Sequence, residues 1–278
     1  MRLIWQLAAV AAVAFLGGQS VAAVQDNAFL TLVLGASTAV LAVLVYRWVV
    51  RRTEHRPVTE LAREGARAAV GRGALLGVAL FGAVILNLAL LGDYDVHGLG
   101  SVSGTVGAAG LMAAAAVTEE LLFRGVLLRI AQERLGTWIA LTLTGALFGL
   151  MHLFNPDATL WGAVAVAIEA GGMLGAAYVA TRSLWLPIGL HLGWNFAESG
   201  IFSTEVSGNG TKQGLLDASV SGSPLLTGGD FGPEGSLYAV LFGALAATVF
   251  LRLARRRGHL VPSRRKANGV DAAATVSR

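Results

Sequence analysis

The feature that most constrains this chain is a series of apolar runs, each long enough to cross a membrane. A transmembrane helix needs about 20 consecutive apolar residues. Candidate spans lie at 3–24, 28–50, 73–92, 105–128, 137–153, 160–181, 184–202 and 236–253. Of the 278 residues, 55% are hydrophobic and only 14% are charged, which is typical of membrane proteins. We therefore expect an all-α, polytopic membrane helix bundle with about eight transmembrane helices.

The first apolar run has some features of a cleaved signal peptide. Met1-Arg2 precedes it, and it continues to about Val24. Signal peptides have shorter apolar regions, and here further spans follow directly. We expect this segment to be retained as the first helix.

The basic residues orient the predicted bundle. If Arg2 lies inside and the spans alternate, all of the 21 Lys and Arg residues except Lys212 fall on the cytoplasmic side. This asymmetry follows the positive-inside rule and predicts a multi-pass protein of the cell membrane with both termini cytoplasmic. The net charge of +4 is therefore interpreted as a topology signal. The expected partner is the lipid bilayer, and no nucleic acid partner is expected.

The spans divide the chain into regions. We expect N-terminal transmembrane helices in 1–104, with a basic, amphipathic cytoplasmic stretch at 51–72 in which Arg63 and Arg67 are spaced i,i+4. A core region at 105–202, which holds the candidate catalytic residues described below, follows; then come an extracytoplasmic Gly/Ser-rich loop at 203–235, a last helix at 236–254 and a basic tail at 255–278. The long loop is expected to be mobile and the tail disordered.

Three charged residues interrupt the apolar region of the core. Glu119, Glu120 and Arg124 follow the run 106–117, and ionisable residues in a membrane segment are functional candidates by default. Glu120 and Arg124 are spaced i,i+4 and are predicted to pair. Glu119 lies about 100° around the helix from Glu120, so we expect the two carboxylates to face different partners. One would then be structural and the other free to react.

Two histidines in separate spans are further candidates. His152 ends the fifth span, and His191 shares a helix face with Asn195 in the seventh. Glu or His can take a proton from water, and His and Asn can donate hydrogen bonds to an oxyanion. The chain has no Cys and no Gly-x-Ser-x-Gly motif, which favours attack by water in the hydrolysis of an acyl bond.

Less specific interpretations of these polar residues stay open. A single buried polar residue often only joins helices. Glu119, His152 and His191 also match a zinc ligand set, although His-Glu-x-x-His is absent. Glu169 stands mid-span before Gly171-Gly172, and Glu198 follows Asn195 closely enough to support the site.

Together these residues resemble the CPBP family, the CAAX-protease and bacteriocin-processing membrane proteins also called Abi proteins. The resemblance covers about residues 106 to 200. It rests on three signatures in order, Glu-Glu-x-x-x-Arg, Phe-x-x-x-His and His-x-x-x-Asn, here Glu119-Glu120 with Arg124, Phe148 with His152, and His191 with Asn195.

The resemblance implies an intramembrane protease, similar to type II CAAX prenyl endopeptidases, whose cavity opens towards the cytosol. It implies that Glu119 and His152 activate a water and that His191 and Asn195 hold the oxyanion. The supporting residues would be Glu120, Arg124 and Phe148. The substrate would be a membrane-associated peptide or protein. Family members are described as metalloproteases, but the reaction can be drawn without a metal, so Zn stays open as a cofactor.

Two alternatives belong to other classes of protein. A non-catalytic scaffold or bacteriocin-immunity protein could share the fold, although such a protein does not need a buried polar constellation. A proton or small-solute transporter could use Glu and His as a relay. No inverted repeat is evident in the sequence, which argues against a transporter.

Overall fold

The computed structural model describes residues 1–210 and 214–263. Over these residues the helices are α1 (Arg2–Ala22), α2 (Ala28–Glu54), α3 (Ala66–Leu91), α4 (Val102–Glu120), α5 (Arg129–Leu135), α6 (Thr137–Met151), α7 (Leu160–Val166), α8 (Met173–Thr181), α9 (Trp185–Asn195), α10 (Pro224–Thr227) and α11 (Leu237–Arg256). Three π-helical segments, η2 (Leu121–Leu128), η4 (Ala167–Gly172) and η5 (Phe196–Ile201), continue α4, α7 and α9. Short 3-10 helices are η1 (Thr59–Leu61), η3 (His152–Phe154), η6 (Gly229–Phe231) and η7 (Pro233–Gly235).

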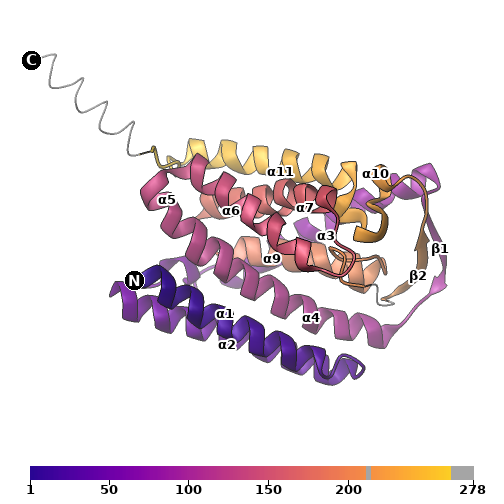
Figure 1. Cartoon of the computed structure of the whole chain (residues 1–278), viewed down its shortest axis with the longest axis horizontal. Helices are drawn as coiled ribbons and strands as arrows, with labels where there is room; N and C mark the ends of the chain where they lie inside the picture. Colours follow the sequence, from indigo (N-terminus) through magenta and orange to yellow (C-terminus); the bar gives the residue numbers. More distant parts are fainter. Residues whose placement is uncertain (211–213, 264–278) are drawn as a thin grey trace, which may run out of the picture.

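The predicted membrane bundle is confirmed. Within the described residues, 7 helices are long and apolar enough to cross a membrane. They include one uninterrupted helix over Val102–Leu135 and another over Leu160–Thr181. The remaining predicted span corresponds to α9 with η5, which is shorter. Figure 1 shows α1 and α2 along one side of the bundle and α11 along the opposite side, with α4, α9 and α6 between them.

The two ends of the bundle differ in charge. We call the end formed by Arg2 and by residues 51–72, 129–137, 182–185 and 252–263 the basic end. We call the other, formed by residues 23–27, 92–101, 155–159, 202–210 and 214–236, the loop end. Among these described residues, the loop end carries acidic side chains and no Lys or Arg. The N-terminus and α5 lie at the basic end in Figure 1, and both strands lie at the loop end.

The described residues of the loop at 203–235 form a strand and long-range contacts that its composition does not predict. Its strand β2 (Leu216–Val220) pairs antiparallel with β1 (Tyr94–Leu99), which lies between α3 and α4, with Tyr94 opposite Val220. The Asn155 amide donates to the Ser207 carbonyl at 2.6 Å. The Trp161 indole donates to Gly235 at 2.7 Å. The partners in these contacts are distant in sequence, so the local pattern of residues does not predict this structure.

The basic stretch at 51–72 spans the end of α2, the connection that follows it and the start of α3. Arg63 lies in the connection between α2 and α3, so Arg63 and Arg67 do not share a helix there. The connection packs on α9, since the Trp185 indole donates to Ala62 at 2.8 Å. The first part of the tail is ordered, because the Thr137 amide donates to the Val261 carbonyl at 2.9 Å. The rest of the predicted disordered tail, 264–278, lies outside the described residues.

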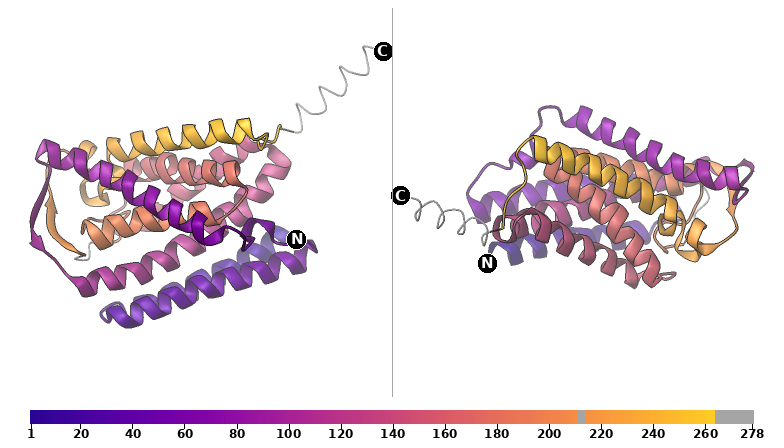
Figure 2. Two further views of the ribbon diagram at one scale, coloured as in Figure 1. Left: turned by 180° about the vertical axis from the view of Figure 1, so that it is seen from behind. Right: turned by 90° about the horizontal axis from the view of Figure 1, so that it is seen from above.

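A close crossing of α3 and α9 fixes the position of the helix that carries His191 and Asn195. Gly73 and Gly77 of α3 face the α9 backbone, and a Cβ at Gly73 would lie 2.4 Å from the Leu186 carbonyl oxygen. In return, a Cβ at Gly193 would lie 2.1 Å from the carbonyl oxygen of Ala74. Both helices therefore use small-xxx-small spacing, which allows backbones to approach in membranes. Figure 2 shows α3 crossing the back of the bundle.

Candidate active site

Glu119 and His152 lie at the same depth in the bundle. Gly136, with φ 81°, makes the turn between the helix ending at Leu135 and α6. Glu119 precedes this turn by about as many residues as His152 follows it, so the antiparallel helices bring them level. The helix that carries Glu119 continues to Leu135, beyond the expected span at 105–128.

Glu120 joins three elements of the site. It is fully buried, and its Oε1 accepts from Arg124 Nη1 at 2.7 Å, which confirms the predicted i,i+4 pair. The same oxygen lies 3.0 Å from His191 Nδ1. Arg124 also donates to the Ala170 carbonyl at 2.9 Å. The buried charges of Glu120 and Arg124 therefore have partners, as buried charges require, although Glu120 Oε2 has none among the described residues.

Glu119 and Glu120 contact the same histidine, contrary to the expectation from helical geometry. Glu119 Oε2 lies 3.9 Å from His191 Nε2, while Glu120 faces Nδ1 of the same ring. The two carboxylates do diverge around the helix. An imidazole, however, has nitrogens on opposite edges and can meet both. The Glu119 side chain is 32% exposed, so it is the more accessible of the two acids.

Phe148 lies at the centre of the site. Its ring is 4.9 Å from that of Phe123 and 4.8 Å from that of His152. The Arg124 guanidinium carbon lies 4.6 Å from the Phe148 ring centroid, within cation–π range. The Phe148 carbonyl oxygen lies 2.7 Å from His152 Nδ1, so this ring nitrogen contacts the backbone of its own helix. Phe148 thus packs against both the ion pair and His152.

A cavity of about 910 Å³ brings the candidate residues together. Its described lining includes Glu119, Phe148, His152, His191 and Asn195. His191 and Asn195 are nearly buried, on successive turns of α9 as their spacing predicts. The cavity wall is largely apolar, so these few polar groups converge on a space large enough for a peptide segment.

Sequence reasoning missed two acidic residues of the cavity, Asp26 and Glu234. Glu234, in the loop expected to be mobile, also lines it. Its carboxylate accepts from the Trp194 indole at 2.9 Å and contacts the Ser207 hydroxyl. Glu169 and Glu198 are fully buried, and their carboxylate oxygens have no hydrogen-bond partner among the described residues. In the sequence, Glu234 is marked only by its position between Pro233 and Gly235, which indicates a turn and gives no sign of a cavity.

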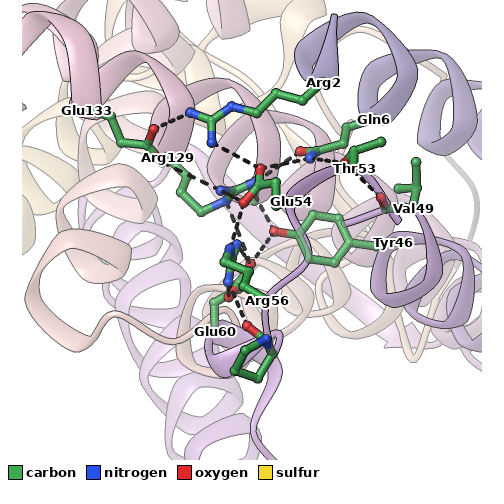
Figure 3. Close-up of polar contacts among 12 residues, drawn as sticks. Arg2, Gln6, Tyr46, Val49, Thr53, Glu54, Arg56, Glu60, Arg129 and Glu133 are labelled. Atoms are coloured by element: carbon green, nitrogen blue, oxygen red, sulfur yellow. Dashed lines mark hydrogen bonds and ion pairs between the residues drawn. The ribbon is translucent and has the colours of Figure 1, made fainter. Parts of the chain in front are cut away.

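The π-helical turn after Glu120 is held from the basic end. The Gly125 carbonyl oxygen accepts from Arg129 Nε at 2.7 Å and lies 2.9 Å from the Tyr46 hydroxyl. Tyr46 also lies 2.7 Å from Glu60 Oε1. Figure 3 shows Tyr46, Glu60 and Arg129 in one polar network with Glu54 and Arg56. A π-helical turn disturbs the backbone hydrogen-bond ladder, and here side chains bind one of its carbonyl groups.

The pKa of Glu60, in the connection between α2 and α3, reflects its contacts within this network. Burial alone would raise the pKa of Glu60, but hydrogen bonds from Arg56 and Tyr46 hold that pKa below its ordinary value. The Arg56 guanidinium donates to both Glu60 oxygens, at 2.8 and 2.9 Å. Glu60 is therefore charged, and both of its carboxylate oxygens accept hydrogen bonds.

The geometry does not fit a three-ligand zinc site. Zinc ligands lie about 2.0–2.3 Å from the ion, so three of them must surround one point. The Glu119 and His191 pair is close enough to flank an ion. Among the described residues, however, no group of three or more His, Asp or Glu side chains is placed to hold a metal.

The fold and site define a multi-pass membrane protein with a buried carboxylate–histidine centre. One comparison points to a family. Residues 101–197 match the family model for Rce1-like, type II CAAX prenyl endopeptidase. This segment contains the site residues of α4, α6 and α9, and the match supports a CAAX-protease type of family for the core of the chain. No curated protein and no solved structure matches the chain significantly.

Proposed function

We propose that this protein is an intramembrane endopeptidase that cleaves a peptide bond in a membrane-associated protein or peptide. The family match supports CAAX-type endopeptidase activity in general. The observation that carries the specific proposal is the position of Glu119. Its partly exposed carboxylate borders the large cavity and lies 3.9 Å from His191 Nε2.

In this proposal Glu119 acts as general base, with His152 helping to hold the water. Glu119 takes a proton from water, and the water oxygen attacks the carbonyl carbon of the scissile bond. The carbonyl oxygen becomes an oxyanion. When the C–N bond breaks, the proton held by Glu119 passes to the leaving amine, and the products are a new carboxyl and a new amino terminus.

His191 and Asn195 would stabilise the oxyanion. Both line the cavity on one face of α9, and hydrogen-bond donors aimed at a developing oxyanion are a large source of catalysis. To donate from Nε2 while Nδ1–H donates to Glu120, the His191 ring must carry both protons. Glu120 and Arg124 would then serve as positioning residues for His191.

The test compares protein termini in membranes from cells that express the wild type or Glu119→Gln. We expect termini that occur only with the wild type, and their sequences identify the substrate. Glu64→Gln is the matched control, because Glu64 is exposed at the basic end. Identical termini in all three samples, with the proteins equally abundant and folded, would refute the protease and favour a scaffold.

A further inference from the structure

We infer that the site takes its substrate from the extracytoplasmic side of the membrane. This inference rests on the proposed function, because only a protease has a substrate to admit. The direction in which the cavity opens does not depend on that function. It differs from the cytosolic opening that the family resemblance implies. Three observations carry it: where the cavity ends, what closes its other side, and how charge is distributed between the two ends of the bundle.

The cavity extends from the candidate site to the loop end. Beyond Glu119 its described lining continues along α4 through Leu111 to Ser103, and it includes the loop residues Asp26 and Asn209. Ser103, Asp26 and Asn209 are exposed to solvent. These residues mark the mouth of the cavity. None of the described lining residues belongs to the basic end.

Paired charges lie between the site and the basic end along the helix that carries Glu119. Arg124 is buried against Glu120, directly beyond Glu119 along the helix. One turn further, Arg129 donates to Gly125 and to Glu54, at 2.7 and 2.9 Å. Figure 3 shows this network joining α1, α2, the α2–α3 connection and α5. A substrate approaching from the basic end would have to break these buried pairs, which is costly.

The charge distribution assigns the two ends to sides of the membrane. Within the described part of the chain, every Lys and Arg except Arg124 lies at the basic end or in the adjoining turns of its helices. The positive-inside rule therefore orients this end towards the cytoplasm. The loop end, with the cavity mouth, then faces the extracytoplasmic side.

The charge of the lining narrows the class of substrate. The described lining contains the acids Asp26, Glu119 and Glu234 and no Lys or Arg. Among these described lining residues a free terminal carboxylate would find no Lys or Arg to pair with, whereas an internal peptide segment needs no such partner. The deeper wall is apolar, as at Leu111 and Met112. The predicted substrate is thus an internal segment where a membrane-anchored polypeptide leaves the bilayer on the extracytoplasmic side.

The absence of cysteine from the sequence makes a direct accessibility test possible. Single cysteines would be introduced as Ser103→Cys at the cavity mouth, Leu111→Cys deeper in it, and Glu64→Cys at the basic end. Sealed spheroplasts of expressing cells are treated with a membrane-impermeant sulfonated maleimide, before and after permeabilisation. None of the three residues belongs to the proposed catalytic set, so each variant can also be checked for cleavage.

We expect Ser103→Cys and Leu111→Cys to be labelled in sealed cells, and Glu64→Cys to be labelled only after permeabilisation. Labelling of Glu64→Cys in sealed cells, or failure to label Ser103→Cys there, would overturn the orientation. Labelling at Ser103 without labelling at Leu111 would show that the cavity is closed to this side and would also refute the inference. These outcomes do not depend on proteolysis, so they separate the sidedness from the proposed function.

Discussion

His191 has a carboxylate at each edge of its ring, and this arrangement decides what the other site residues can do. Glu120 is buried and engaged by Arg124, whereas Glu119 reaches the cavity. The Glu120–Arg124 pair could be predicted from i,i+4 spacing, because both residues lie on one helix. The shared contact with His191 could not, because it depends on how α9 crosses α4.

At the residue scale, Asn195→Ala should slow cleavage. Removing a donor to an oxyanion typically lowers the rate by about 10²–10³-fold, and we expect that loss in kcat with little change in KM. The measurement is the initial rate of terminus formation against substrate concentration. A change confined to KM would instead mean that Asn195 binds the substrate and does not stabilise the transition state.

The helices are positioned by features that the apolar runs alone do not reveal. The runs predicted the spans because lipid-facing helices must be apolar along their length. The structure of 203–235 could not be predicted this way, since it depends on pairing with β1 and on contacts with Asn155 and Trp161. The glycine spacing on α3 and α9 was a usable signal for close packing.

Gly73→Ala tests whether this packing sets the position of α9. The added methyl would lie 2.4 Å from the Leu186 carbonyl oxygen, which is backbone and cannot move alone. We expect a lower Tm and slower cleavage, although α3 contributes none of the proposed catalytic residues. Gly71→Ala is the control, because no heavy atom lies within 4 Å of its Cβ position. Equal behaviour of the two variants would show that the close approach is unimportant.

Tyr46→Phe tests whether the basic-end network positions the π-helical turn. The variant keeps the ring but loses the hydroxyl near Gly125 and Glu60. Losing a buried hydrogen bond costs about 1 kcal/mol, so we expect a modest fall in Tm and a measurable fall in kcat. Tyr238→Phe, which removes a hydroxyl from the loop-end start of α11, away from that network, is the comparison. A normal kcat in Tyr46→Phe would restrict Tyr46 to a structural role.

At the scale of the whole molecule, charge divides the bundle into a paired basic end and an open loop end. The composition and the positions of Lys and Arg predicted the bundle and its two ends, because lipid and the positive-inside rule act on sequence directly. The location of the cavity could not be predicted, because it arises from the gap left between α1, α4 and α6.

Glu60→Gln should weaken the basic end in a pH-dependent way. The pKa of Glu60 is lowered in the folded protein, so its stabilisation is present above the ordinary carboxyl pKa of about 4.5 and is lost as pH falls through the lower folded value. We expect the variant to be less stable near pH 7, by about 1–3 kcal/mol, and the difference to narrow below pH 4.5. Thermal unfolding in detergent across this range would measure it. A difference independent of pH would contradict the proposed charge pairing.

The central claim is that Glu119 activates the water that cleaves the substrate. The most direct measurement is the rate at which wild-type-dependent termini form in isolated membranes containing equal amounts of wild type, Glu119→Gln or Glu64→Gln. Loss of a general base lowers rates by about 10²–10⁴-fold, so Glu119→Gln should fall by at least about 10²-fold, and Glu64→Gln should match the wild type. A Glu119→Gln rate close to that of the wild type would contradict the account.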